Sequence, residues 1–346
     1  MSDIEATKQT RRLQLTGGST YTLSIPKNWI DDLELKIGDN ITLIKNLNKT
    51  LTILPKLQDD DPSTSCIISI SNKDTDEAIR RKIIAIYLSG FKTIKIKAKG
   101  MEILPNHVKI IRELVRSSLI GTEIIESNQN SLTFQVLTQL PQLSFDVALK
   151  RMYLMAISIH REAMDAFAKA DSKLAEDVIR MDDEVDRFSL YMMRSLNLAS
   201  QDGRVLLEVG LKKPSDCLGY RTVIKCIERI ADHGVLIAKR IKFLESPMKG
   251  NLLKSITQLS EKSIEAFNNS ITSLTKKDFF LAEKIAEQIS NVIENEKQLM
   301  DSLHESSKNS TVIKFILEDI RRTAEYSRDI AEVVMDENIQ NVISEA

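Results

Sequence analysis

Two stretches in the second half of this chain, both helical in pattern, carry acidic residues four positions apart: Asp182 and Asp186, then Glu228 and Asp232. Residues i and i+4 lie on the same face of an α-helix, with their Cβ atoms about 6 Å apart. If the two helices form an antiparallel hairpin, Asp182 lies level with Asp232, and Asp186 with Glu228. Four converging carboxylates make an all-oxygen site that suits a hard or borderline cation. We therefore take them as candidate ligands for a divalent metal or iron (Mg, Mn, Fe or Zn).

The region that holds these acids is duplicated, and the second copy lacks the acidic pattern. Leu174-Ala175-Glu176 recurs as Leu281-Ala282-Glu283, 107 positions later, and a repeat of that length is a supersecondary module. The positions that correspond to the four acids are, in order, Ile289, Ile293, Arg321 and Glu325. Because isoleucine and arginine do not bind a cation, the chain holds one metal site or cluster at most. Acids four apart are also common on solvated helix faces, so a purely structural role stays open.

From residue 143 to about residue 340, apolar residues recur at three- and four-residue intervals, as in amphipathic helices. The pattern predicts six helices, at 144–170, 173–200, 212–244, 251–275, 278–304 and 308–340. Residues 143–340 should therefore form an all-α bundle of two three-helix repeats. The two acidic pairs fall on the second and third helices of the first repeat. His233, next to Asp232, is a further candidate to join or orient a ligand.

Residues 63–140 alternate between strand and helix patterns and predict a small α/β domain of order β-α-β-α-β-β. The expected strands are 66–70, 93–97, 123–126 and 132–137, and the expected helices are 75–89 and 106–119. The segment contains no glycine-rich phosphate loop and no nucleophile elbow. We assign it no ligand.

Residues 8–57 predict a small all-β domain. Strands are expected at 12–16, 20–25, 41–44 and 51–54, with a turn at Gly17-Gly18 and a short helix opened by Pro26. Four short strands and one helical turn bury too little surface to form a stable core alone. Such a unit usually pairs with a second copy of itself.

The bulk composition is that of a soluble globular chain. The 346 residues carry a formal net charge of −1, so any nucleic-acid surface must be local. The three cysteines form no CxxC pair, which fits a reduced compartment and no zinc knuckle. No apolar stretch approaches the length of a membrane span. We expect a cytoplasmic protein without membrane insertion and, since no nucleophile–base grouping stands out, not an enzyme.

The segment 227–234, IERIADHG, followed by Ile237-Ala238, resembles the signature of the PhoU family of phosphate-signalling regulators. The resemblance covers about 143–340. It implies two three-helix repeats with Glu/Asp-x-x-x-Asp metal motifs, which match Asp182, Asp186, Glu228 and Asp232. It also implies a phosphate ABC transporter or a sensor protein as a partner. The second repeat departs from the family pattern, since neither motif survives there.

Residues 24–27 (SIPK), 33–35 (LEL), 36–39 (KIGD) and 51–55 (LTILP) resemble a SpoVT/AbrB-type swapped-hairpin DNA-binding domain. Members of that family build the fold from two interleaved chains. The resemblance therefore implies a homodimer or higher homo-oligomer that binds double-stranded DNA. Such a domain ahead of a PhoU-like bundle is similar to an archaeal-type fusion.

The candidate DNA contacts are four cations in the same segment: Lys8, Arg11, Arg12 and Lys27. Residues 6–30 contain no acid. Each phosphate that such a cation neutralises steepens the dependence of log K on log salt by about 0.9. Four cations in 25 residues is close to average composition, and only the missing acids are unusual.

The leading hypothesis is a transcriptional regulator of phosphate uptake or phosphate signalling, whose helical bundle senses a metal or a partner protein. The alternative is a signalling adaptor that docks on a phosphate transporter or sensor kinase without specific DNA binding. A metal enzyme that uses the four carboxylates is a third hypothesis, and it requires a substrate pocket that the sequence does not show.

Overall fold

The computed structural model describes residues 9–45, 50–55, 65–100, 102–137, 144–245, 247–303 and 309–343. The chain divides into two compact units, residues 1–62 and residues 63–346. None of the helices in the described ranges combines the length and apolar character that crossing a bilayer requires.

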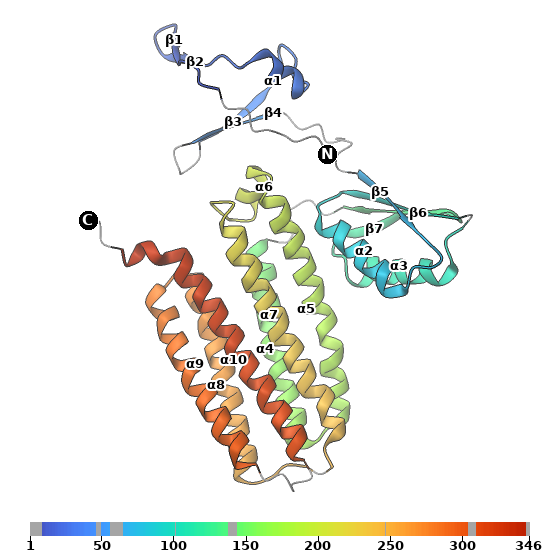
Figure 1. Ribbon diagram of the computed structural model, residues 1–346, viewed down its shortest axis with the longest axis vertical. Coiled ribbons are helices and arrows are strands. Elements are labelled where there is room, and N and C mark those ends of the chain that lie inside the picture. Colours follow the sequence, from blue (N-terminus) through green and yellow to red (C-terminus); the bar gives the residue numbers. More distant parts are fainter. Residues whose placement is uncertain are drawn as a thin grey trace. The chain divides into compact units, whose positions relative to one another are not determined.

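The first unit consists of two antiparallel hairpins and one short helix. Its elements are β1 (Gln14–Thr16), β2 (Thr20–Thr22), α1 (Lys27–Asp32), β3 (Ile41–Lys45) and β4 (Leu51–Pro55), as labelled in Figure 1. Gly17 and Gly18 turn the chain between β1 and β2 with φ of 64° and 81°, a conformation that costs glycine little. The β1–β2 and β3–β4 pairs form separate sheets.

The described part of this first unit has no buried core. Among the side chains that the structure describes between residues 9 and 55, none is buried. Leu15, Tyr21, Leu43 and Leu51 are each more than half exposed. Isolated exposed hydrophobic residues are ordinary, but a unit built only of them gains almost nothing from folding alone.

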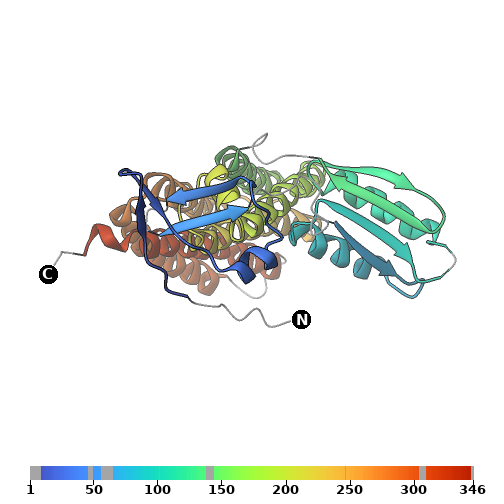
Figure 2. The same ribbon diagram turned by 90° about the horizontal axis from the view of Figure 1, so that it is seen from above.

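The second unit begins with a four-stranded sheet of strand order β5-β6-β8-β7. Its elements are β5 (Ser65–Ile70), α2 (Asp76–Leu88), β6 (Thr93–Ala98), α3 (Pro105–Ser117), β7 (Thr122–Ser127) and β8 (Ser131–Val136). β5 and β6 run parallel, and the other neighbours run antiparallel. Both helices cover one face of the sheet (Figure 2), where Ile83, Ile94 and Phe134 are among the fully buried residues.

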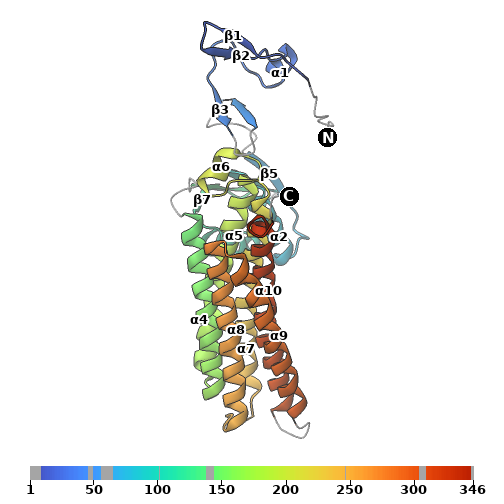
Figure 3. The same ribbon diagram turned by 90° about the vertical axis from the view of Figure 1, so that its left-hand side faces the viewer.

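A bundle of six long helices makes up the rest of the second unit (Figures 1 and 3). They are α4 (Phe145–Lys169), α5 (Ser172–Ala199), α7 (Asp216–Arg240), α8 (Asn251–Lys276), α9 (Phe279–Ser302) and α10 (Ser310–Asn338). The predicted fold class is confirmed, down to the six long helices and the β-α-β-α-β-β order. The sequence did not predict α6 (Gly203–Glu208), which lies in the connection between α5 and α7.

The duplication is visible in the turns that start the second helix of each repeat. Ala170 and Lys277, which lie 107 positions apart, both end a helix in the left-handed conformation, with φ of 52° and 55°. Asp171 and Asp278 follow them as N-caps, each accepting backbone N–H bonds from the next helix. The same turn, with an aspartate N-cap after a left-handed residue, is therefore built twice at the same offset.

Buried polar contacts join the two repeats. His160 of α4 is fully buried and lies 2.8 Å from Ser260 Oγ of α8. Burial lowers the pKa of His160 to about 3, so this imidazole is neutral at physiological pH. In α10, Asp319 is 1% exposed and is paired with Arg240 and His233 of α7. A buried carboxylate is tolerated only with such partners.

One arginine of the bundle forms several hydrogen bonds with the α/β domain. Arg194, near the end of α5, is buried and donates to the carbonyl oxygens of Tyr87, Gly90 and Phe91 at the end of α2. Its guanidinium also lies 4.9 Å from the centre of the Tyr87 ring. Asn197, one turn further on, donates to the Leu88 carbonyl at 2.7 Å. The helix that carries Asp182 and Asp186 is therefore bonded directly to the α/β domain.

Candidate functional site

The acidic residues of the first repeat lie on two helices that pack against each other, α5 and α7. Val185 and Phe188 point into the core from α5, and Ile227 and Ile230 from α7. With these apolar faces turned inward, the acids fall at the margin of the contact. The side chains of Asp182 and Glu228 are half-buried, whereas Asp186 and Asp232 are exposed.

Burial and mutual repulsion raise the pKa values of three of these acids. Burial and then the charge of Asp232 raise the pKa of Asp182 to about 6. Although the Asp186 side chain is accessible to solvent, partial desolvation beside the helix contact, followed by the charges of Asp182, Glu228 and Asp232, raises its pKa to about 7. The pKa of Asp232 is raised in the same way, by partial desolvation and by Glu228. Four carboxylates are therefore held within electrostatic range, at a cost that a bound cation would relieve.

The hydrogen bonds and ion pairs of the four carboxylates determine which of their oxygens are available to bind a metal. Glu228 accepts from Ser189 Oγ and forms an ion pair with Lys225 Nζ at 2.7 Å. Oδ1 of Asp182 is buried and has no hydrogen-bond partner among the described residues. The donor set is all carboxylate oxygen, which fits a hard divalent cation. No three acidic, histidine or cysteine side chains in the described ranges already surround a single point.

One ring nitrogen of His233, the residue beside Asp232, is paired outside the acidic face. Its Nδ1 lies 2.8 Å from Asp319 Oδ1 of α10, so the imidazole binds the second repeat instead. The next residue, Gly234, lies against α4, where an added Cβ would come within 2.7 Å of Ile159 Cγ2. This part of the family-like segment therefore packs helices together.

The second repeat carries the opposite charge pattern at the equivalent positions. In the first repeat, Lys225 and Glu228 form an i,i+3 ion pair; in the second, the corresponding residues Glu318 and Arg321 form one with the signs exchanged. Arg321 also pairs with Glu325, the counterpart of Asp232. Glu296, the counterpart of Ser189, is buried with its carboxylate 3.9 Å from Arg321. In the second repeat, the guanidinium of Arg321 therefore provides the positive charge among the acidic side chains.

Replacing Asp186 by asparagine is expected to stabilise the cation-free protein at pH 8 and to have less effect at pH 5. The pKa is raised from 3.8 to about 7, so the folded state holds a proton that the unfolded chain releases. Stability from this group is therefore lost as the pH rises from about 4 to about 7. After solvent screening, we expect a gain of roughly 2–4 °C in melting temperature at pH 8 in chelator.

Asp183→Asn is the matched control for that measurement, because Asp183 is an exposed carboxylate on the same helix turn. Its melting temperature should stay within about 1 °C of the parent at both pH values. A lower melting temperature for Asp186→Asn than for the parent at pH 8 would show that the carboxylate is not under repulsion.

Three of the four candidate DNA-contacting cations are in the described part of the first unit. Arg11, Arg12 and Lys27 are all exposed, and Arg11 donates to Gln9 Oε1 at 2.6 Å. Lys8 lies outside the described residues. The surface around them also contains a hollow of about 350 Å³, lined mainly by apolar residues that include Leu23, Trp29 and Ile53.

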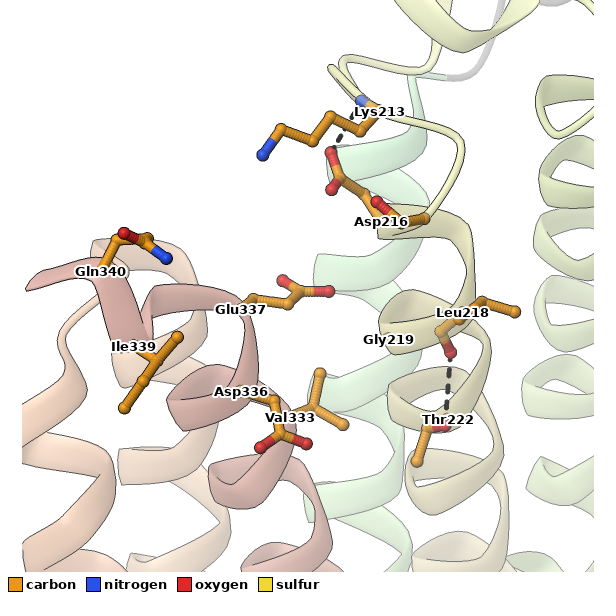
Figure 4. Close-up of a pocket in the computed structure, with 11 residues that line it drawn as sticks. Lys213, Asp216, Leu218, Gly219, Thr222, Val333, Asp336, Glu337, Ile339 and Gln340 are labelled. Carbon is orange, nitrogen blue, oxygen red and sulfur yellow. Dashed lines mark hydrogen bonds between the residues drawn. The ribbon is translucent and has the colours of Figure 1, made fainter. Parts of the chain in front are cut away.

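A second acidic feature, not predicted from the sequence, is a groove of about 500 Å³ between the start of α7 and the end of α10 (Figure 4). Asp216, Asp336 and Glu337 line it. Burial and the charge of Asp216 raise the pKa of Glu337 to about 6. Gly219 leaves room for this side chain, since a Cβ there would overlap with Glu337 Oε1. Asp216 lies over 100 positions before Asp336 and Glu337, so no local spacing signals the groove.

Comparison with known proteins matches both units of the chain. Residues 149–241 match the PhoU domain, and residues 14–61 match the family described as antidote-toxin recognition MazE, bacterial antitoxin. A phosphate-specific transport system accessory protein PhoU homolog from Xylella fastidiosa is 27% identical over 198 residues, covering 54% of this chain and 79% of the relative. Its namesake in Aquifex aeolicus is 28% identical over 159 residues, covering 43% and 67%.

A solved structure, the phosphate transport system regulatory protein PhoU from Streptococcus pneumoniae, superposes with a TM-score of 0.49 at 17% identity. It covers 58% of this chain and 96% of the other.

The chain is a multidomain protein. In sequence order, a small β-hairpin unit comes first and a duplicated three-helix bundle comes last. The first repeat of that bundle contains a PhoU domain, matched over residues 149–241, and the unit that precedes it in sequence contains a MazE/AbrB-like domain, matched over residues 14–61, as the sequence resemblance predicted.

Proposed function

We propose that this chain is a dimeric DNA-binding regulator of phosphate uptake or phosphate signalling, in which the helical bundle reads a signal and the MazE/AbrB-like unit binds duplex DNA. The observation that carries the proposal is that one chain contains two such parts. A PhoU domain follows a unit that has no buried described side chain and that bears a cationic segment without acids.

Dimerisation is supported by the state of the first unit. With none of its described side chains buried between residues 9 and 55, the unit needs apolar surface from elsewhere to be stable. A second copy supplies the same surface, and the hollow lined by Leu23, Trp29 and Ile53 gives that copy apolar residues to pack against. A twofold pair then presents every cation twice.

DNA binding is supported by charge and exposure. Arg11, Arg12 and Lys27 are exposed, on a chain whose net charge is close to zero, and residues 6–30 contain no acid. Cations in a segment without acids can neutralise backbone phosphates and bind duplex DNA largely without regard to sequence. Sequence-specific binding also requires contacts between the protein and the base edges of a particular DNA site, the operator.

Signal reading is supported by the acidic face of the first repeat. A divalent cation bound by Asp182, Asp186, Glu228 and Asp232 would offset the desolvation and the mutual repulsion that raise the pKa values of Asp182, Asp186 and Asp232. When bound, the cation would supply charge neutralisation. The second repeat needs none, because Arg321 already pairs with Glu318 and Glu325. Since α5 is bonded to the α/β domain through Arg194, a change at the acidic face reaches that domain through one helix.

Arg12→Ala is expected to weaken duplex DNA binding and to flatten its salt dependence. A twofold pair loses two phosphate contacts per substitution, so the slope of log K against log salt should fall by about 2. The measurement is a fluorescence-anisotropy titration of a labelled duplex at several salt concentrations. Arg11→Ala should behave alike.

Lys36→Ala is the control, because Lys36 is an exposed cation of the same unit that lies beside Asp39, outside the acid-free segment. Its salt slope should match that of the parent protein. Equal slopes for parent, Arg11→Ala and Arg12→Ala would remove these arginines from the DNA interface.

A second candidate function is an adaptor that docks on a phosphate transporter or sensor kinase without specific DNA binding. The observation that favours it is the description of the relatives as transport-system accessory proteins. The two functions differ in one respect that is easily measured. A regulator selects particular fragments from sheared genomic DNA, and an adaptor does not.

A further inference from the structure

The two edges of the four-stranded sheet in the α/β domain are built differently. β7 carries Glu123 and Glu126 and has an irregular register between Ile124 and Glu126. Charges and bulges on an edge strand prevent it from pairing with another chain. β5, with the sequence SCIISI, carries no charge, no proline and no bulge. Its middle residue, Ile67, is 62% exposed.

The backbone of β5 has one side free for pairing in the described structure. Ile70 accepts a hydrogen bond from Lys99 N–H at 2.8 Å, on the side of β6. In a parallel ladder, alternate residues direct both backbone groups to the same side. Cys66, Ile68 and Ile70 therefore bond to β6. Ser65, Ile67 and Ser69 direct their N–H and C=O groups away from the sheet.

We infer that β5 is an interaction surface for a second copy of this chain, whose own β5 pairs with it in antiparallel fashion to give a continuous eight-stranded sheet. The register that satisfies all outward groups places Ile67 opposite Ile67 of the second copy, and Ser65 opposite its Ser69. Antiparallel pairing of identical strands is twofold by construction. The two Ile67 side chains then lie next to each other on the face of the sheet opposite to α2 and α3.

The linker between the two units favours a second copy of this chain as the partner of β5. This inference rests on the dimer of the proposed function, in which two MazE/AbrB-like units form a pair. Nine residues separate Pro55 at the end of β4 from Ser65 at the start of β5, and they span at most about 35 Å. Pairing of the first units therefore tethers the two β5 edges to each other through two such linkers. Short tethers of this kind raise the effective concentration to about the millimolar range.

Disulfide trapping in the full chain tests the register. In a Cys66→Ser background, Ile67→Cys should convert most of the protein to a covalent dimer under mild oxidation, since directly opposite residues lie within disulfide reach. Ile125→Cys is the matched control. It places a thiol at an isoleucine of β7 that is 54% exposed, and it should remain uncrosslinked. The remaining cysteines, Cys217 and Cys226, are buried.

A second readout uses a variant that keeps the fold. Ile67→Lys places a charge at an exposed position of β5, so the domain should fold while the strand pairing is lost. In the parent dimer, the amide of Ser69 should exchange slowly with deuterium, and in Ile67→Lys it should exchange at the rate of an unpaired strand edge.

The outcomes separate this inference from the proposed function. If light scattering shows a dimer while Ile67→Cys stays uncrosslinked, or crosslinks no better than Ile125→Cys, the β5 pairing is wrong and the proposed dimer stands. If Ser69 exchanges fast in the dimeric parent, the edge is free or serves another partner, and the pairing is again wrong. A monomeric parent protein overturns both proposals.

Discussion

Arg194→Ala is expected to lower the stability of the α/β domain and its attachment to the bundle by about 3–5 kcal/mol. The carbonyl oxygens of Tyr87, Gly90 and Phe91 lose their shared donor, and each buried unpaired carbonyl costs about 1–3 kcal/mol. These costs are not additive, because the arginine also no longer needs to be desolvated. Urea unfolding measures the loss in the free energy of unfolding. Hydrogen exchange of the amides in residues 76–98 then shows whether the loss falls on the α/β domain.

Two further substitutions calibrate that result. Asn197→Ala removes one hydrogen bond, to the Leu88 carbonyl, and should cost about 1–2 kcal/mol. Arg194→Lys keeps the charge but cannot reach three carbonyls with a fixed planar fork, so it should fall between the two. If Arg194→Ala cost no more than Asn197→Ala, the arginine would not be the main link between bundle and α/β domain.

Arg321→Met is expected to destabilise the second repeat by about 2–4 kcal/mol at pH 7 and by less at pH 4. The change leaves Glu296, Glu318 and Glu325 without their common partner. Glu296 is 5% exposed, and burial already raises its pKa. Breaking a buried ion pair on one side leaves an uncompensated charge, which costs about 3–5 kcal/mol in the fully buried limit. Protonation of the glutamates at low pH removes that charge.

Arg322→Met is the matched control, because Arg322 pairs with Glu318 and Glu325 but its side chain is 44% exposed. Its loss should cost under about 1 kcal/mol, as for a surface ion pair. Thermal unfolding at the two pH values distinguishes the variants. Equal melting temperatures for Arg321→Met and Arg322→Met would mean that Arg321 is not an internal counter-ion.

Much of the fold could be predicted because its signals are local. The six long helices follow from apolar periodicity, and their boundaries from residues such as Asp171 and Asp278, which cap the helices that follow them. The β-α-β-α-β-β order follows from alternation in the same way. The recurrence of Leu174-Ala175-Glu176 at 107 positions exposed the duplication before any contact was known.

What the sequence could not supply are contacts between distant positions. Nothing near Arg194 indicates that its guanidinium meets three carbonyls more than 100 positions away. The pairing of His233 with Asp319 has no local signal either, so the histidine was assigned to the neighbouring acids. The strand order β5-β6-β8-β7, and with it the difference between the two sheet edges, depends on pairing that spacing alone does not determine.

The acidic face is an intermediate case. Spacing placed Asp182 and Asp186 on one helix face, and their pKa values are raised first by burial and then by the charges of acids on both helices. That Glu228 is already held by Ser189 and Lys225 was not predictable, because Ser189 is 39 positions away on another helix. The metal site itself stays a prediction.

Selection of genomic DNA by the purified full-length protein tests the central claim most directly. Sheared DNA from the source organism is incubated with the parent protein or with an Arg11→Ala, Arg12→Ala double variant, and the bound fragments are sequenced. We predict a small set of fragments enriched by the parent protein alone, located upstream of genes for phosphate uptake. Recovery indistinguishable from input, or equal enrichment by the double variant, would contradict the account.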